Sequence, residues 1–308
     1  MAKPILLDND LHKIVSNLSD STENAFIESV KPEEDTETII TFPEKASTPS
    51  KLAQRERFIT PIPPRPAAYL QDAAAASYGT RKSLEVVIGD DDREQVLNTL
   101  ENPWRQVAAL RIRARNGKTY AGTAWFISPT LLATAGHCVY MHEEGGWPVE
   151  IEVIPALNGT ERPFDSVKSA KFESNNGWIN DRNSDYDYGV IILDEPVSNA
   201  IGYFSFAAPP DNFLKSNIAN ISGYPTDLDR ATRQYYHARE ITRASSRRLY
   251  YEIDTYGGQS GSPIWMNLGE GERVAIGIHT TGSSTSNFGT RITEEIFNNL
   301  RTWKNLYS

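Results

Sequence analysis

The sequence has a single cysteine, Cys138, among 308 residues, so no internal disulfide bond can form and packing must hold the fold together. No uninterrupted apolar run approaches the roughly 18 residues that a membrane-spanning helix needs. The first apolar run, residues 5–7, ends at a charged residue, whereas a secretory signal has about 7 to 15 apolar residues. We therefore expect no membrane span and no signal peptide at this end.

Basic runs are also lacking, and the formal net charge is -9 with a pI of about 5.2. Such a chain has no electrostatic attraction for nucleic acid or for an anionic membrane. The sequence carries no cluster of metal ligands, phosphate-binding loop or dinucleotide fingerprint. We expect no cofactor, although the many acids leave room for a structural calcium ion. A protein or peptide substrate and a monomeric chain are the expected partner and state.

The sequence contains two regions of different composition, residues 1–85 and 86–308. Residues 1–85 are acidic and Ser/Thr-rich, then proline-rich at residues 60–66, a composition that favours extended backbone over a packed core. They are interpreted as a largely irregular presegment, with one helical turn expected at residues 72–77. Residues 86–308 are interpreted as one globular domain.

That domain consists of short β-rich runs separated by Gly, Asn, Asp and Pro. Strands are predicted at residues 107–113, 122–128, 131–134, 149–154, 188–193, 218–222, 249–254 and 274–279. This pattern predicts an all-β barrel or sandwich. Ile296, Leu300 and Trp303 then recur at helical spacing behind Thr293, a capping residue, which predicts an amphipathic helix at about residues 293–304.

A glycine-flanked serine, Ser260, lies in the segment Gly257-Gly-Gln-Ser-Gly-Ser-Pro263. The glycines allow a tight turn that exposes the hydroxyl and lets successive N–H groups point into one pocket. We predict Ser260 as a nucleophile, with the N–H groups of Gly258 and Ser260 as an oxyanion hole. The alternative is a Gly/Ser turn without chemistry.

A base and an orienting acid occur upstream. His137 follows an apolar strand in the string Ala133-Thr-Ala-Gly-His-Cys-Val139, and its imidazole has the right pKa to accept a hydroxyl proton. Asp187 directly precedes a buried strand and is predicted to orient that imidazole, in preference to Asp185, interpreted as a loop residue. Among the other histidines, His12 and His142 are expected on the surface and His237 has no assigned role.

These segments together carry a family resemblance over residues 86 to about 305. The motifs are Thr134-Ala-Gly-His-Cys138, Asp187-Tyr-Gly-Val-Ile191, Ser222-Gly-Tyr-Pro225, Asp254-Thr-Tyr-Gly-Gly-Gln-Ser-Gly-Ser-Pro263, Ile278-His-Thr-Thr-Gly282 and Asn287-Phe-Gly-Thr-Arg-Ile292. They resemble those of trypsin-like serine peptidases, and in particular the bacterial glutamyl endopeptidases, and they share the family order His, Asp, Ser.

The resemblance implies two antiparallel six-stranded β-barrels with the triad in the crevice between them. It also implies cleavage after Glu, and less well after Asp, with the substrate carboxylate met by His279, Thr255 and the α-amino group of a new N-terminus at Val86. An acid in the family position for Arg/Lys specificity, Asp254, keeps trypsin-like cleavage as an alternative.

Two departures from the family pattern stand out. The usual cysteine partner of Cys138 is replaced by Gly122, so we expect Cys138 to be a free thiol. Gln259 replaces the aspartate that captures the new N-terminus in the animal enzymes. The resemblance implies secretion, whereas the free thiol and the N-terminal residues are compatible with an intracellular location.

An octet beginning at Val86 resembles the start of mature glutamyl endopeptidases. We predict a zymogen cut at Glu85–Val86, which the enzyme itself can perform, with Lys82–Ser83 as the alternative site for a trypsin-like enzyme. Two other functions stay open: a narrowly targeted intracellular processing protease and an inactive, peptidase-like binding module.

Overall fold

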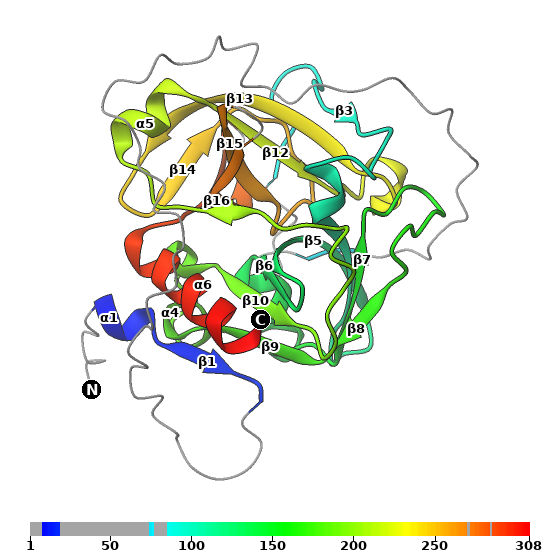
Figure 1. The fold of residues 1–308 in the computed structure, drawn as a ribbon. Coiled ribbons are helices and arrows are strands. Elements are labelled where there is room, and N and C mark those ends of the chain that lie inside the picture. The colour runs from blue at the N-terminus through cyan, green and yellow to red at the C-terminus, as the bar shows by residue number, and fades with distance from the viewer. Residues whose placement is uncertain (1–7, 19–73, 77–84, 270–271, 284) are drawn as a thin grey trace.

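The computed structural model describes residues 8–18, 74–76, 85–269, 272–283 and 285–308. Its strands form two mainly antiparallel sheets, one from the first half of the domain and one from the second, stacked in the view of Figure 1. Each sheet encloses buried hydrophobic residues. The predicted all-β class with a C-terminal helix is confirmed, with one closed six-stranded barrel in the second sheet (the second barrel) and a half-barrel in the first sheet (the first barrel).

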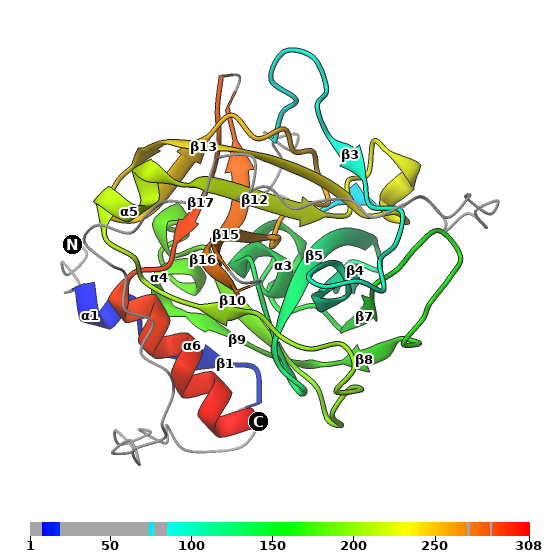
Figure 2. The ribbon, with the colours of Figure 1, turned by 45° about the horizontal axis from the view of Figure 1, so that its top comes forward.

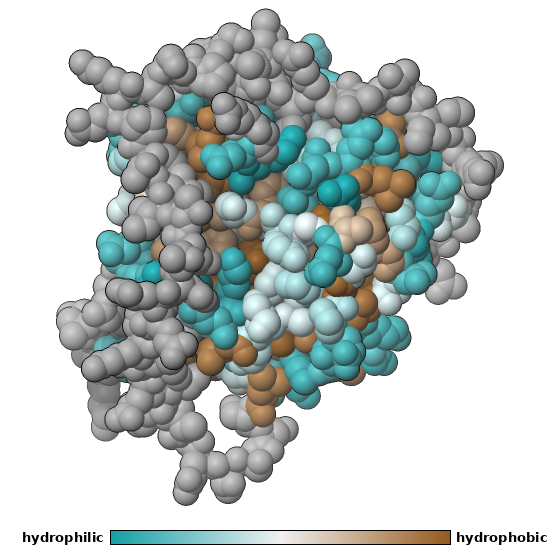
Figure 3. Space-filling model, in the orientation of Figure 1, coloured by the Kyte–Doolittle hydropathy of each residue, from teal (hydrophilic) through white to brown (hydrophobic). Residues whose placement is uncertain are grey.

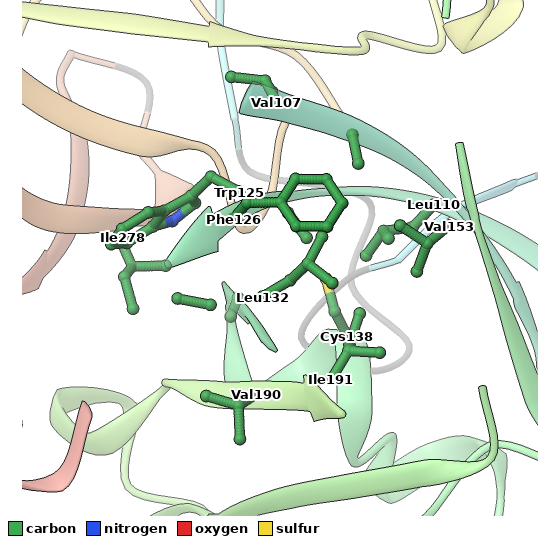
Figure 4. Packing of buried hydrophobic residues seen from close by; sticks show 14 of the residues in the cluster. Val107, Leu110, Trp125, Phe126, Leu132, Cys138, Val153, Val190, Ile191 and Ile278 are labelled. Carbon is green, nitrogen blue, oxygen red and sulfur yellow. The ribbon is translucent and has the colours of Figure 1, made fainter. Parts of the chain in front are cut away.

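The first sheet curves round a packed interior. Its main strands are β4 (Val107–Arg113), β5 (Thr119–Ser128), β6 (Leu131–Thr134), β7 (Glu150–Pro155), β8 (Val167–Ser169), β9 (Lys171–Asn175) and β10 (Gly189–Ile192), in the order β9-β10-β6-β5-β4-β7-β8. The strands at the two ends of this order, β8 and β9, are separated only by Ala170, so the sheet curves back toward itself. Figure 4 shows its packed interior, which includes Leu110, Phe126 and Leu132.

The second sheet closes through β16, which pairs with strands on both of its sides. Its six strands are β12 (Ile218–Gly223), β13 (Tyr235–Ala244), β14 (Arg248–Tyr251), β15 (Pro263–Gly269), β16 (Glu272–Gly282) and β17 (Asn287–Arg291). Two short strands extend it, β3 (Glu94–Gln95) beside β13 and β11 (Ser205–Phe206) beside β16. Each of the eight strands predicted from the sequence overlaps an observed one.

The C-terminal helix α6 spans Glu294–Tyr307, three residues beyond the predicted end. Thr293 caps it, because its hydroxyl accepts a hydrogen bond from the N–H of Ile296 at 3.4 Å. Its apolar face packs on the first barrel, where the indole N–H of Trp303 donates to the carboxylate of Glu173. Figure 2 shows α6 running along this barrel beside β9.

The other helices are short. They are α1 (Asp8–Leu11), α3 (Gly136–Val139), α4 (Asn176–Ile179) and α5 (Asp211–Ser216), with 3-10 turns η1 (Trp104–Gln106), η2 (His142–Glu144), η3 (Ser184–Tyr186) and η4 (Asp229–Ala231). Within the described part of the chain, no helix has the length and apolar character to cross a bilayer. Figure 3 shows hydrophobic residues on one face as small patches between polar ones.

Two pieces of the presegment add strands to the first sheet. β1 (Ile14–Ser16) pairs antiparallel with β9, and β2 (Ala74–Ala75) pairs parallel with β5. The helical turn expected at residues 72–77 is therefore wrong at Ala74 and Ala75. Pairing with β5, continued by a 2.8 Å bond from the N–H of Ala76 to the carbonyl of Ala121, overrides the helix propensity of alanine.

Candidate active site

His137 and Asp187 meet in a buried position, in the segments that follow β6 and precede β10 of the first barrel. Asp187 Oδ2 lies 2.8 Å from His137 Nδ1, and Asp187 Oδ1 accepts the backbone N–H of His137 at 2.8 Å. Both side chains are at most 1% exposed. Burial by itself lowers the pKa of His137, but the nearby Asp187 charge raises it, and the pKa lies well above its ordinary value. This pair has the geometry of an oriented general base.

Gly136 makes this close approach possible. Asp187 precedes β10 and His137 lies in α3 just after β6, and these two strands are paired. A Cβ atom at Gly136 would come within 3.0 Å of Asp187 Oδ1 and 2.8 Å of the Trp178 ring, so a larger residue would push the carboxylate away. The small-residue string before His137 thus has a direct structural role.

The rejected alternative, Asp185, has another partner. Its carboxylate accepts a hydrogen bond from the guanidinium of Arg248, and its side chain is 38% exposed. Asp187, in contrast, is fully buried. The preference for Asp187 over Asp185 therefore agrees with their contacts.

The Ser260 turn depends on two glycines with left-handed backbone. Gly258 has φ of 102° and Gly261 has φ of 90°. A Cβ atom would lie 2.5 Å from the Tyr224 carbonyl at Gly258 and 2.1 Å from the Thr123 carbonyl at Gly261. Both positions therefore require glycine for two reasons: the positive φ and the lack of space for a Cβ atom. Gln259 stabilises the turn, since its Oε1 accepts the N–H of Tyr256 at 3.0 Å.

This turn is bonded to both barrels. The carbonyl of Ser260 accepts the N–H of Thr123 in β5 at 2.9 Å, and the N–H of Gly261 donates to the carbonyl of His279 in β16 at 2.7 Å. Cys138 Sγ, next to His137, lies 3.6 Å from the same Ser260 carbonyl. The structure thus brings the serine turn and the His137 turn together where the barrels meet. The catalytic roles of the triad and of the Gly258 and Ser260 N–H groups stay predictions.

The Ser260 hydroxyl itself faces an unexpected partner. It donates a hydrogen bond to Oε1 of Glu85 and lies 3.5 Å from the carbonyl of Thr280. Glu85, the last residue of the presegment, is only 3% exposed. Nothing in the local sequence around Glu85 indicates this burial, because the contact joins residues far apart in the chain.

His279 lies close to the same oxygen of the Glu85 carboxylate. His279 Nε2 is 3.5 Å from Glu85 Oε1, and His279 Nδ1 is 2.6 Å from the hydroxyl of Tyr251. Burial and the Glu85 charge keep the pKa of Tyr251 well above its ordinary value, so this hydroxyl retains its proton. By donating to Nδ1 it leaves the proton on Nε2, facing the carboxylate. The sequence reasoning missed Tyr251, which lies in an ordinary β-strand pattern.

The other residues predicted for the specificity pocket lie close by. Thr255 is buried, its N–H donates to the carbonyl of Val86 at 3.4 Å, and its hydroxyl has no hydrogen-bond partner among the described residues. The N–H of Val86 donates to Oδ1 of Asn287 at 3.1 Å, and Asn287 Nδ2 returns a bond to the Val86 carbonyl at 2.6 Å. Asn287 is a second residue that the sequence reasoning did not assign.

Asp254, the acid behind the alternative Arg/Lys specificity, is used for another purpose. Oδ1 accepts the N–H of Ile88 at 2.7 Å and Oδ2 accepts the N–H of Asp92 at 3.0 Å. Burial raises the pKa of Asp254, but bonds from His237 and these two amides outweigh it and leave the pKa below its ordinary value. Asp254 therefore anchors residues 88–92, which follow the predicted cut at Glu85–Val86.

One described group has ligand atoms close enough to share a metal ion. Atoms of Asp92, His237 and Asp254 lie within 4.8 Å of one another. The amides of Ile88 and Asp92 already occupy the Asp254 oxygens, and Arg239 donates to Asp92 Oδ2 at 2.5 Å and to His237 Nε2 at 3.3 Å. A guanidinium in this position supplies the positive charge that a cation would otherwise bring.

Cys138 is a buried free thiol, as its sequence context predicted. A Cβ atom at Gly122 would lie 3.1 Å from its sulfur, so Gly122 does occupy the position facing Cys138. Figure 4 shows the sulfur surrounded by apolar side chains of the first barrel.

Of the two histidines expected on the surface, one is buried and the other is partly exposed. His12 is 6% exposed, and His142 is half-buried with Nε2 2.8 Å from the carbonyl of Trp178. Burial lowers the pKa of His142. The expectation fails for His12, because long-range packing that is invisible in the local sequence covers its ring.

Comparison with known proteins gives a consistent result. The sequence model of the family described as Trypsin matches residues 98–303. The chain is 40% identical over 230 residues to the glutamyl endopeptidase of Bacillus licheniformis, a match that covers 72% of this chain and 70% of that protein. It is 34% identical over 220 residues to the extracellular metalloprotease of Bacillus subtilis, covering 71% and 70%.

A solved structure is also similar. A Glu endopeptidase in complex with MPD aligns with a TM-score of 0.65 at 31% identity, covering 71% of this chain and 100% of that chain. The matched residues 98–303 contain His137, Asp187 and Ser260.

Proposed function

Since this chain belongs to the trypsin family and is a serine endopeptidase, we propose that it cleaves peptide bonds after glutamate, and less well after aspartate. The supporting observation is the environment of the Glu85 carboxylate, which is buried against the Ser260 hydroxyl and 3.5 Å from His279 Nε2. A pocket that accepts a glutamate side chain of its own chain is suited to the same side chain in a substrate. The name of the relative from Bacillus licheniformis agrees with this specificity.

The proposed mechanism rests on the His137–Asp187 contact and on the position of the Ser260 turn beside the His137 turn. His137 Nε2 removes the proton from the Ser260 hydroxyl. The serine oxygen then attacks the main-chain carbonyl carbon of the substrate glutamate residue. Asp187, bonded to Nδ1, holds the imidazole in position and stabilises its positive charge. The N–H groups of Gly258 and Ser260 bind the oxyanion. The C–N bond then breaks, the leaving amine takes the proton from His137, and water hydrolyses the acyl-enzyme by the same steps.

The uncut chain is proposed to be a zymogen. A serine hydroxyl has one hydrogen, and while it is donated to Glu85 it is not available to His137. Glu85 also fills the space that a substrate glutamate needs. A cut at Glu85–Val86 would release this side chain and create an α-amino group at Val86, near Thr255 and Asn287, as a further positive charge for the substrate carboxylate.

The alternatives receive less support. Cleavage after Arg or Lys would need an acid free to meet a cation, but both oxygens of Asp254 accept backbone amides. An inactive binding module would have no use for a buried His137–Asp187 pair beside a glycine-constrained serine. The metalloprotease name of the Bacillus subtilis relative suggests metal dependence, but the one described candidate cluster contains a bound guanidinium.

One experiment tests the proposal. Full-length protein and its Ser260→Ala variant are incubated with peptides that differ only in Glu, Asp, Arg or Leu before the cut bond, with and without EDTA. We expect turnover of the Glu peptide by the parent alone, insensitive to EDTA, and a new N-terminus at Val86 by sequencing. Equal turnover by the Ser260→Ala variant, loss of turnover in EDTA, or preference for Arg would each contradict it, as would an active enzyme that keeps residue 85.

A further inference from the structure

Residues 8–18, here called the N-terminal clamp, are built into the folded domain although they belong to the presegment. Ile14–Ser16 forms an additional strand on the edge of β9. Asn17 continues the pairing, since its N–H donates to the carbonyl of Phe172 at 3.1 Å and its side-chain oxygen accepts the N–H of Phe172 at 2.7 Å. Figures 1 and 2 both show β1 beside β9.

The side chains of the clamp reach further than its strand. His12 is 6% exposed, with Nδ1 2.8 Å from the Tyr188 hydroxyl and Nε2 2.9 Å from Arg247 Nη1. Its ring lies tilted against that of Tyr186, with the ring centroids 4.8 Å apart, and its carbonyl accepts a hydrogen bond from Asn299 Nδ2 at 2.8 Å. Because Arg247 can only donate, Nε2 acts as acceptor and Nδ1 carries the proton toward Tyr188.

These contacts join three separate parts of the protein. Tyr186 and Tyr188 belong to the first barrel and flank Asp187, Arg247 lies between two strands of the second barrel, and Asn299 belongs to α6. Leu11 and Ile14 add apolar contact with the first core. We propose that the β9 edge and the His12 pocket form a docking surface for residues 8–18 of the same chain, which remain bound there as a non-covalent segment when the chain is cut after them.

The proposal goes beyond glutamate specificity and does not require the cut at Glu85–Val86. Edge-strand pairing satisfies backbone groups of β9 that would otherwise need water, and a buried, fully bonded histidine anchors the segment between the barrels. The clamp therefore behaves as a subunit of the domain and not as a leader that falls away once the chain is opened.

The test uses full-length Ser260→Ala protein with a recognition sequence for a highly specific protease inserted between Pro49 and Ser50. This cut separates the clamp from the rest of the chain but leaves Ala74–Ala76 and Glu85 attached to the catalytic domain. After cutting, we expect the N-terminal fragment to co-elute with the domain in gel filtration and to separate only in denaturant. Separate elution in native buffer would overturn the proposal, and so would elution as a dimer, which would mean that the clamp docks on a second copy.

Two substitutions in the same background identify the anchor. His12→Ala should weaken retention of the fragment at least tenfold, whereas Lys13→Ala should leave it unchanged, because the neighbouring Lys13 side chain is 61% exposed. Equal retention of the fragment by both variants would show that His12 does not anchor the clamp. If His12→Ala fails to fold, hydrogen exchange of the uncut parent still decides, since rapid exchange at Ile14–Ser16 would contradict docking. Ser260→Ala keeps the enzyme from cutting itself, so a wrong assignment of specificity would not affect these results.

Discussion

The hydroxyl group of Ser260 donates a hydrogen bond to the carboxylate of Glu85, which lies 175 residues earlier in the chain. The predicted nucleophile and the predicted activation site are thus in contact before any cut. The proposed cut at Glu85–Val86 would therefore have two effects: it would remove a side chain from the pocket and add a positive charge at Val86. Substitutions at Glu85 can test the proposed inhibition of the uncut chain.

Two uncharged substitutions at Glu85 test whether its side chain blocks Ser260 by filling the pocket. Both Glu85→Gln and Glu85→Ala remove the glutamate before the predicted cut, so both proteins should stay uncut. Glutamine still fills the space beside Ser260, whereas alanine leaves it open. We expect a fluorophosphonate probe to label Ser260 at least about tenfold faster in Glu85→Ala than in Glu85→Gln, measured by intact mass.

Glu195→Ala, at an exposed position, is the control and should be processed like the parent. Equal labelling of the two Glu85 variants would refute the blocking role of Glu85. Rapid processing of Glu85→Gln between residues 85 and 86 would refute the role of Glu85 in self-cleavage.

The raised pKa of His137 predicts a specific pH dependence. A general base must be neutral, so kcat/KM should rise with pH through the pKa of His137, which the Asp187 charge holds above its ordinary value of about 6.5 against the effect of burial. Asp187→Asn removes that charge and should move the rise to lower pH. The rate should also fall on the order of 10⁴-fold, by analogy with the same change in trypsin.

The His137–Asp187 pair should also make the free energy of unfolding depend on pH in a defined direction. A pKa raised by folding stabilises the protein at pH values below the unfolded pKa, and this contribution is lost as pH rises through the folded value. Urea unfolding of Ser260→Ala protein at several pH values, with and without Asp187→Asn, measures this contribution.

For the rate, a pH–rate profile that Asp187→Asn leaves unshifted would argue that a group other than His137 sets the acid limb.

His279 should determine discrimination and not the chemical step. A hydrogen bond to a charged group contributes about 1.5–3 kcal/mol, so His279→Ala should lower kcat/KM for a Glu peptide by roughly 10- to 100-fold. Turnover of a Leu peptide should change little. Tyr251→Phe removes the hydroxyl that sets the imidazole proton and should give a smaller loss, up to about tenfold, in the same direction.

The ratio of Glu to Leu turnover in processed enzyme is the measurement. Lys118→Ala, at an exposed position, is the control and should leave the ratio of Glu to Leu turnover unchanged. Gly89→Ala would be unsuitable, because the φ of Gly89 is 82° and alanine would be strained there. If His279→Ala reduced both peptides equally, the histidine would support the fold of the pocket and not its selectivity.

Much of the fold follows from local pattern. Val107–Arg113 and Leu131–Thr134 were predicted with their observed bounds because apolar runs of that length are strands in either barrel. Tyr235–Ala244 and Asn287–Arg291 were not predicted, since they are rich in polar residues that the second barrel buries or pairs at long range. Periodicity carries no information on such pairing.

The site divides in the same way. His137 and Ser260 stand in small-residue turns whose glycines are forced by close contacts, and those turns are visible in sequence. The burial of Glu85, the Tyr251–His279 bond and the docking of His12 each join residues far apart in the chain. No local propensity reports them, and only the folded chain reveals them.

Gly122 and Cys138 offer a test of the register of the first barrel. A disulfide has an S–S bond of about 2 Å, which puts each Cβ about 3 Å from the partner sulfur, and a Cβ at Gly122 would lie 3.1 Å from Cys138 Sγ. Gly122→Cys in a Ser260→Ala background should therefore form a disulfide on oxidation. A closed loop of about 15 residues contributes on the order of 3 kcal/mol, so the Tm should rise by several degrees.

Gly122→Ser carries the same Cβ without the bond, and adding reductant to the unfolded Gly122→Cys protein before refolding should remove the gain. Thiol titration in denaturant should find one free thiol in the parent and none in oxidised Gly122→Cys. Two free thiols after oxidation would mean that β5 and α3 are not in the register described. A disulfide without a gain in Tm would instead point to crowding by Ile112, whose Cδ1 would lie 3.2 Å from the new Cβ.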